Sequence, residues 1–206
     1  MQGQREIWEA TYELEWPQAA ASGPSDFARE AAGLLRRRSR VLELGCGAGV
    51  DAAYLAGQGH AVVALDFAEP ALRRNRRHWA GVSGLHFVCG DIAAPLPFAD
   101  GAFGMVYARL SLHYFPDAVT RRCFAEIERV IVESGLLAFM CKSTQDPLYG
   151  RGSALEPDMF ELDHVRHFFS EAYARDCLGG RFAIEQLRSR GDGRSAFVEV
   201  IARKRG

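Results

Sequence analysis

Short apolar runs alternate with amphipathic segments along most of the chain. Five runs have the composition of buried strands, at residues 40–44, 61–66, 85–89, 103–109 and 136–141. Helical spacing of apolar positions fills most of the gaps, at residues 26–38, 69–80, 117–132 and 171–178, and Ser25 is suited to cap the first of these helices. Alternating strands and helices predict crossover connections and a mainly parallel sheet.

The C-terminal part of the chain has a different pattern. Two strand-like runs, 181–188 and 196–203, flank the turn Gly191-Asp192-Gly193, which is typical of a β-hairpin. The stretch 143–169 has no clear period and is rich in turn formers, which indicates either a functional loop or an irregular surface connection. We expect one domain over residues 1–206, with N-terminal helices in 1–38 and a lid at 143–169.

The composition suits one globular domain without a bias toward polyanionic partners. The chain has 206 residues, is 48% hydrophobic and carries a formal net charge of -1, so a nucleic-acid partner is not expected. Its five cysteines form no C-x-x-C pair, which favours reduced thiols over disulfides or a zinc site. Without a signal-peptide pattern or a run of about 18 apolar residues, we expect a cytoplasmic protein with no membrane partner, of undetermined oligomeric state.

Three glycines stand at every second position in ELGCGAGVD, directly after the first predicted strand. Gly45, Gly47 and Gly49 allow positive φ and let a ligand approach the backbone, while the following helix offers free N–H groups at its N-terminus. Asp66 ends the next strand, 21 residues after Gly45, where a carboxylate can accept hydrogen bonds from ribose hydroxyls. The arrangement favours a nucleotide-like ligand, although a tight turn without a ligand has the same glycines.

Neighbouring residues separate the candidate nucleotides. The NAD fingerprint G-x-G-x-x-G/A needs Gly or Ala at position 50, where this chain has Val50. Glu43 lies inside the first strand, where a buried carboxylate needs a partner such as a ligand ammonium, unless it only braces the loop. Asp91 and Ile92 follow the third strand, where the carboxylate can accept from an adenine amino group and the isoleucine can pack on the ring, unless Asp91 only caps a turn.

With these residues the chain resembles the class I S-adenosylmethionine-dependent methyltransferases. VLELGCGAGVDAAYLAGQGHAVVALD is similar to the first two motifs of that family and GDIAAPLPFADGAFGMVYARLSLHYF to the next ones, so the likeness covers about residues 41–137. KSTQDPLYG and RHFFS are similar to segments of small bacterial tellurite-resistance methyltransferases. The resemblance implies a doubly wound, Rossmann-like α/β fold with seven strands, and S-adenosyl-L-methionine as cofactor, converted to S-adenosyl-L-homocysteine.

The family pattern implies a cofactor site at particular positions of this chain. In addition to Glu43, the predicted site contains Gly45, Cys46, Gly47 and Gly49, which the family pattern places against the methionine portion of the cofactor. The pattern places Asp66 and Phe67 against ribose and adenine, and Asp91 and Ile92 against adenine. Arg109 and Leu110 form the floor of the pocket in this pattern. Two positions depart from the pattern. Gly104 replaces a common Asp, which suggests that one brace of the glycine loop is missing, and Glu133-Ser134-Gly135 replaces a Pro-Gly-Gly turn.

Methyl transfer from a sulfonium is an in-line displacement that depends mainly on alignment, so no catalytic triad is required. A proton acceptor, if one is used, should follow strand four or five, at the ligand-binding edge of the sheet. His113 and Tyr149 are the candidate catalytic residues there, with a packing role as the alternative for His113. His164 and His167 lack a recognisable metal-site order and a third ligand, so no metal is expected.

Two further clusters each have an ordinary and a functional interpretation. Trp8, Tyr12 and Trp16 form an aromatic stripe at helical spacing, which suits either core packing or a helix that lies over the cofactor. A basic cluster on one predicted helix suits either a solvated face or an RNA-binding patch; it comprises Arg73, Arg74, Arg76 and Arg77.

We therefore predict an enzyme that methylates a small-molecule acceptor. Three alternatives stay open. A catalytically silent cofactor-binding regulatory protein would show no turnover, and Gly104 is compatible with this alternative. An RNA methyltransferase would bind RNA in a salt-dependent way. An NAD oxidoreductase would shift nicotinamide fluorescence. The sequence names neither the acceptor nor the accepting atom.

Overall fold

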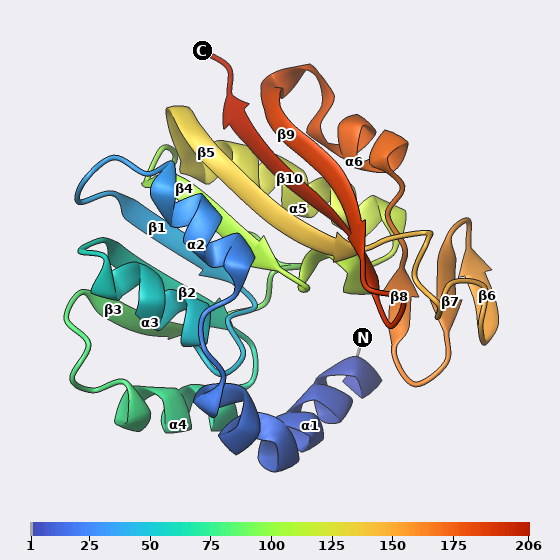
Figure 1. Cartoon of the computed structure of the whole chain (residues 1–206), viewed down its shortest axis with the longest axis horizontal. Coiled ribbons are helices and arrows are strands. Elements are labelled where there is room, and N and C mark those ends of the chain that lie inside the picture. The colour runs from blue at the N-terminus through green and yellow to red at the C-terminus, as the bar shows by residue number, and fades with distance from the viewer. Residues whose placement is uncertain (1) are drawn as a thin grey trace.

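The fold is organised around a sheet of seven strands in the order β3-β2-β1-β4-β5-β10-β9 (Figure 1). The computed structural model describes residues 2–206. The strands are β1 (Arg40–Leu44), β2 (Ala61–Asp66), β3 (Leu85–Cys89), β4 (Phe103–Arg109), β5 (Ile131–Lys142), β9 (Phe182–Gly191) and β10 (Ala196–Lys204). Strands β1 to β5 pair in parallel, whereas β10 is antiparallel to both β5 and β9. The predicted doubly wound sheet with a C-terminal antiparallel hairpin is confirmed.

Helices cover both faces of this sheet. One face packs against α2 (Asp26–Gly33), α3 (Val50–Gly57) and α4 (Glu69–His78), and the other against α5 (Asp117–Val130) and α6 (Glu171–Leu178). Because successive side chains of a strand point to opposite faces, Val41 belongs to the first core and Leu42 to the second. Parallel strands place their carboxyl ends at one edge of the sheet, where ligands bind in such folds.

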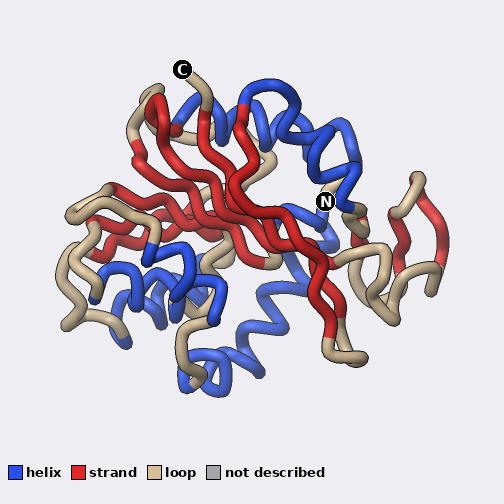
Figure 2. The backbone as a smooth tube through the Cα atoms, turned by 45° about the horizontal axis from the view of Figure 1, so that its top comes forward, coloured by secondary structure: helices blue, strands red, loops and turns tan. Residues whose placement is uncertain are grey.

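Three short strands, β6 (Ser153–Glu156), β7 (Met159–Glu161) and β8 (Val165–His167), form a second, antiparallel sheet. Figure 2 shows this small sheet set apart from the large one. It lies in the stretch that the sequence marks only as a loop or lid. Strands of three or four residues are too short to leave a visible period in the sequence.

Helix α1 (Gln2–Ala21) extends from the side of the small sheet to α4 (Figure 1). Pro17 has no N–H, so the carbonyl of Glu13 loses its usual helical donor. Arg74 of α4 donates to the carbonyl oxygens of Tyr12 and Glu13, at 2.8 and 3.3 Å. One arginine of the basic cluster thus anchors α1. No helix in residues 2–206 is long and apolar enough to span a membrane.

Several element ends differ from the sequence prediction. Helix α2 begins after its Ser25 cap, as predicted, but stops at Gly33, five residues before the predicted end at position 38. Glycine is a poor helix former, and the next residue, Leu34, already takes the C-cap position, with its N–H bonded to the carbonyl of Ala31. Strand β5 begins at Ile131, five residues before position 136, because it follows α5 directly.

Candidate active site

Two cavities open at the carboxyl edge of the parallel strands. The first has a volume of about 220 Å³ and the second about 400 Å³. Their walls share five residues, Trp8, Tyr12, Gly45, Leu110 and Tyr114. The cavities therefore meet above the glycine loop, at the start of η1 (Leu112–Tyr114) and under α1.

The glycine loop, residues 45–49, uses the backbone freedom that its sequence predicts. Gly45, Gly47 and Gly49 all have positive φ, at 71°, 52° and 73°. A Cβ on Gly45 would lie 2.5 Å from the Cβ of Ser111, and one on Gly47 would lie 2.8 Å from the hydroxyl oxygen of Tyr12. The loop is thus closely packed and leaves no room for side chains at these positions.

Hydrogen bonds with three neighbouring side chains hold the loop. Asp66 accepts from the N–H of Gly47 at 2.9 Å, and the side-chain amide of Asn75 donates to the carbonyl of Gly47 at 2.7 Å. The indole N–H of Trp79 donates to the carbonyl of Ala48 at 2.8 Å. The sequence indicates Asp66 but gives no signal for Asn75 or Trp79. Asn75 lies in α4 and Trp79 caps its C-terminus, and the composition of this helix is dominated by arginines.

Glu43 lies in the wall of the second cavity with only 4% of its surface exposed. Its Oε2 atom is buried and has no hydrogen-bond partner. Burial, with the nearby Asp51, raises the pKa of Glu43 well above its ordinary value. Asp51 itself is satisfied, because it accepts from the backbone N–H and hydroxyl of Ser25 and from the hydroxyl of Tyr107. Glu43 is therefore the acid of this region that has unused acceptor capacity.

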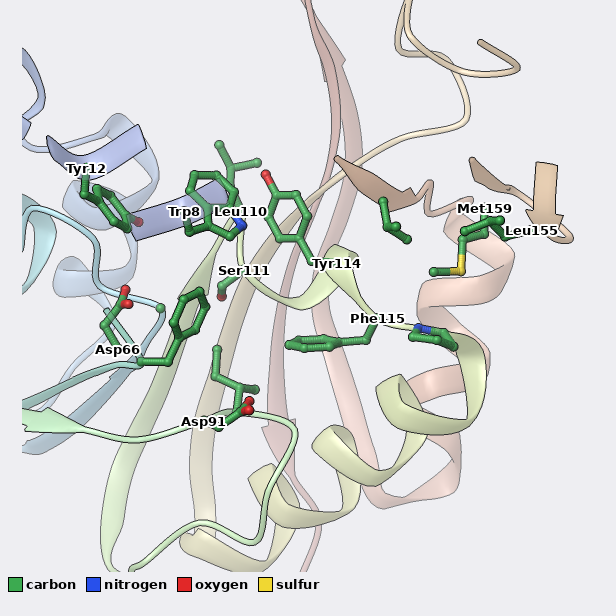
Figure 3. Close-up of a pocket in the computed structure, with 15 residues that line it drawn as sticks. Trp8, Tyr12, Asp66, Asp91, Leu110, Ser111, Tyr114, Phe115, Leu155 and Met159 are labelled. Carbon is green, nitrogen blue, oxygen red and sulfur yellow. The ribbon is translucent and has the colours of Figure 1, made fainter. Parts of the chain in front are cut away.

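Asp66 and Asp91 both lie in the wall of the first cavity, together with Phe67 and Ile92 (Figure 3). The carboxylate of Asp66 accepts from the backbone N–H of Gly47 and of Ala68, so each oxygen has one protein partner. Asp91 accepts from the N–H of Ala93 at 2.9 Å, so it does cap a turn, as one of the two interpretations of the sequence predicts. This bond does not exclude a further bond to a ligand. A carboxylate oxygen has two lone pairs, and both acids can still accept from a ligand.

The remaining predicted cofactor residues fall into three groups. Cys46, Gly47 and Arg109 lie in the wall of the second cavity, and Gly45 and Leu110 contribute to both cavities. Leu110 has a φ of 56°, an unusual conformation for leucine that places strain at the junction. Gly49 lines neither cavity in the described structure; a Cβ there would lie 2.9 Å from the ring of Phe87.

Both candidate catalytic residues lie outside the two cavity walls. His113 is fully buried, and neither of its ring nitrogens has a hydrogen-bond partner. Burial lowers its pKa to about 3, so it is neutral at physiological pH. Tyr149 is 39% exposed and donates its hydroxyl to Asp158 at 2.6 Å. Among the residues that the structure describes, no group of three or more His, Cys, Asp or Glu could hold a metal ion.

Gly104 lies far from the glycine loop that it was expected to affect. Its nearest neighbours are Ser39 and the carbonyl oxygen of Arg40, at the amino end of β1. The glycine loop follows the opposite end of the same strand. The missing aspartate therefore removes no brace from the loop, and this expectation was wrong.

Comparison with known proteins agrees with this geometry. The sequence profile of the family described as a methyltransferase domain matches residues 41–135, which include the glycine loop, Asp66, Asp91 and Arg109. A demethylmenaquinone methyltransferase of Clavibacter sepedonicus is 35% identical in a segment that covers 60% of this chain and 51% of the length of that enzyme. A malonyl-[acyl-carrier protein] O-methyltransferase of Enterobacter lignolyticus is 31% identical over 74% of this chain and 59% of its own. The chain thus spans about half the length of the curated relatives it matches.

The fold has solved counterparts. The crystal structure of the 1,6-didemethyltoxoflavin-N1-methyltransferase of Burkholderia thailandensis, with bound 1,6-didemethyltoxoflavin and S-adenosylhomocysteine, superposes with a TM-score of 0.72. The two sequences are 18% identical, and the superposition covers 98% of this chain and 88% of the Burkholderia chain. At that identity the likeness concerns the fold. Over residues 41–135 the chain is similar to methyltransferase domains, and its fold is that of solved S-adenosylmethionine-dependent methyltransferases.

Proposed function

We propose that this chain transfers a methyl group from S-adenosylmethionine to a small-molecule acceptor. The observation that carries the proposal is Glu43, a buried carboxylate with an unpartnered oxygen in a cavity wall beside the glycine loop. Such a group is costly unless a partner arrives. The α-amino group of the cofactor's methionine portion is a cation that can satisfy it. The residues present therefore fit this cofactor.

The other wall residues suit the remaining parts of the cofactor. Asp66 would accept from the ribose hydroxyls, and Asp91 from the adenine amino group, with Phe67 and Ile92 against the ring. The backbone at Gly45 would face the methionine portion, where a side chain would collide with Ser111. When bound, the cofactor supplies a methyl group on a positively charged sulfur leaving group. The protein then contributes alignment and exclusion of water, which can be worth roughly 7–11 kcal/mol.

No observation favours a second function. The argument for a catalytically silent protein depended on Gly104, which lies at the other end of the sheet from the loop. The argument for an RNA enzyme depended on the basic cluster, of which Arg74 anchors α1 and Arg76 pairs with Glu69 at 2.9 Å. Val50 stands against the dinucleotide fingerprint.

Calorimetric titration with S-adenosylhomocysteine tests the proposal. The wild-type protein should bind it, and Glu43→Gln should weaken binding by about tenfold or more, because a hydrogen bond between charged groups is worth about 1.5–3 kcal/mol. Glu161→Gln, an exposed position of β7, is the matched control and should bind like the wild type. Absence of binding to the wild type would end the proposal, and full affinity in Glu43→Gln would place the ammonium elsewhere.

The same variant separates ligand binding from stability. Burial raises the pKa of Glu43 in the folded state, so its stabilising contribution is complete below the unfolded pKa of about 4.3 and is lost as pH rises through the folded pKa. Glutamine stays neutral at every pH. In the absence of ligand, Glu43→Gln should therefore melt at a higher temperature than the wild type at neutral pH, even though it binds the cofactor less well.

A further inference from the structure

The first cavity extends beyond the residues assigned to the cofactor. Its far end is formed by α1, by η1, by the start of α5 and by the small sheet, opposite Asp66 (Figure 3). The wall there consists of Trp8, Tyr114, Phe115, Pro116, Leu155, Met159 and Val165. This end, which we call the apolar end, is continuous with the cofactor end and is the place left for the methyl acceptor.

The described side chains that line the apolar end carry no formal charge. Arg166, the neighbour of Val165 in β8, does not line the cavity and is hydrogen-bonded to the hydroxyl of Tyr114. Arg166 also forms an ion pair with Asp163, so its charge is compensated. A charged acceptor would lose its hydration at this end without gaining an opposite charge, which is costly. The wall thus disfavours phosphorylated, zwitterionic or carboxylate-bearing acceptors.

Aromatic rings give the apolar end its shape. The rings of Trp8 and Tyr114 meet edge to face, with centroids 5.1 Å apart and an interplanar angle of 79°. The ring of Trp8 also stacks on His164, at 4.7 Å and 22°, which fixes α1 against the loop between β7 and β8. Phe115 lies across the cavity from them in Figure 3. Fixed aromatic walls favour flat ring ligands, which gain offset-stacked and edge-to-face contacts beyond the burial of apolar area.

The wall also limits how the acceptor loses its proton. Neither cavity has a histidine among its described lining residues. Burial raises the pKa of Tyr114 to about 12 and that of Tyr12 well above its ordinary value, so both stay protonated at neutral pH. The acids that line the first cavity lie at its cofactor end (Figure 3). A base from the wall is thus not available at the apolar end.

From these features we propose that the acceptor is an uncharged aromatic ring compound, methylated on a ring hydroxyl or ring nitrogen that needs no protein base. The oxygen or nitrogen forms the new bond to the methyl carbon, the sulfonium S–C bond breaks, and the proton of the acceptor passes to solvent. This inference rests on the proposed function, because it takes the apolar end as the place where the methyl group is received.

Ligand titrations of the protein saturated with S-adenosylhomocysteine test this class. The probes are 2-naphthol, naphthalene-2-sulfonate, which has the same ring with a fixed charge, and phosphoethanolamine, which is charged and has no ring. We expect 2-naphthol to bind at least about tenfold more tightly than either charged probe, a difference of about 1.4 kcal/mol. Equal or tighter binding of a charged probe would overturn the proposal.

A matched pair of variants locates the binding. Leu155 lines the apolar end and is 48% exposed, whereas Leu162, between β7 and β8, is 56% exposed and outside both cavities. Leu155→Glu should weaken 2-naphthol binding by about tenfold, since it brings a charge to the ring, and Leu162→Glu should leave it unchanged. Equal effects of the two variants would show that the ring binds elsewhere. Both variants should keep wild-type affinity for S-adenosylhomocysteine. If the wild-type protein itself fails to bind S-adenosylhomocysteine, the proposed function is overturned, and not only the proposed class of acceptor.

Discussion

The two ends of the active site are built from different parts of the chain and are held by different forces. The cofactor end lies where β1 to β4 terminate, and hydrogen bonds from Asp66, Asn75 and Trp79 hold its loop. The apolar end combines α1, η1 and the small sheet, which meet through ring contacts of Trp8 and Tyr114. Hydrogen bonds fix a backbone in one geometry, whereas ring contacts tolerate exchange of side chains. The cofactor end therefore suits a ligand that is the same in related enzymes, and the apolar end suits an acceptor that differs between them.

The largest effect should come from filling the glycine loop. Gly45→Ala places a Cβ 2.5 Å from the Cβ of Ser111 at a φ of 71°. Left-handed strain costs about 1–2 kcal/mol and overpacking about 1–3 kcal/mol, so a loss of about 3 kcal/mol in unfolding free energy is expected, with much weaker binding of S-adenosylhomocysteine. Denaturant unfolding and calorimetry measure the two effects.

The control for this variant is a glycine in open space. Gly57→Ala at the end of α3 meets nothing within 4 Å and needs no positive φ, so it should be neutral or stabilising by up to about 1 kcal/mol. If Gly45→Ala is too unstable to study, the double variant Gly45→Ala/Ser111→Gly removes the opposing Cβ and should recover part of the loss. No recovery would mean that the collision with Ser111 is not the cause.

The next effect should come from Asn75, which joins α1 to the cofactor loop. It is fully buried, accepts from the indole N–H of Trp16 at 2.7 Å and donates to the carbonyl of Gly47 at 2.7 Å. Asn75→Ala removes the partners of the Gly47 carbonyl and the Trp16 indole N–H, at about 1–3 kcal/mol for each group that is fully buried. Because Trp16 is only half-buried and water can reach it, a loss of about 2–3 kcal/mol in unfolding free energy is expected. Cofactor affinity should fall as well.

An exposed position of the same helix provides the comparison for Asn75. Arg77→Ala removes a charge without removing a buried contact and should change the unfolding free energy by less than about 0.5 kcal/mol. A further measurement, hydrogen exchange of α1, should show faster exchange in Asn75→Ala, because the helix loses one of its links to α4. Unchanged exchange would show that the other contacts of α1, those of Arg74 and of the Trp8 ring, are enough to hold the helix in place.

The difference between the two ends also explains what the sequence could predict. Four of the five predicted parallel strands have the predicted bounds, and most of the residues proposed to bind the cofactor lie in cavity walls near their carboxyl ends. A buried strand and a glycine turn are local features with a strong period and composition. Asp66 and Asp91 are predictable for the same reason, since strand ends of a parallel sheet share one edge.

The apolar end depends on contacts that no local pattern encodes. The ring of Trp8 packs on His164, which is 156 positions later in the chain. Strands β6 to β8 are too short to show a period, so the stretch 143–169 could be marked as a lid but not given a structure. The lid role itself stays a prediction, supported by the positions of Leu155, Met159 and Val165 in the cavity wall.

The smallest expected effect at neutral pH concerns His113, whose ring lies 4.3 Å from that of Tyr114 in the wall of the apolar end. Burial lowers its pKa to about 3, below the unfolded value of about 6.5. Its contribution to stability is therefore present above the unfolded pKa and is lost as pH falls toward the folded one, because the unfolded chain binds the proton first. His113→Leu should reduce the acid dependence of the unfolding free energy by up to about 1.4 kcal/mol per pH unit between about pH 6 and pH 4. His86→Gln, at an exposed histidine of β3, should leave that dependence unchanged. A variant His113→Leu that kept the wild-type acid dependence would contradict the lowered pKa of His113. If that variant also lost methyl transfer to a ring acceptor, His113 would be the proton acceptor that the sequence suggested.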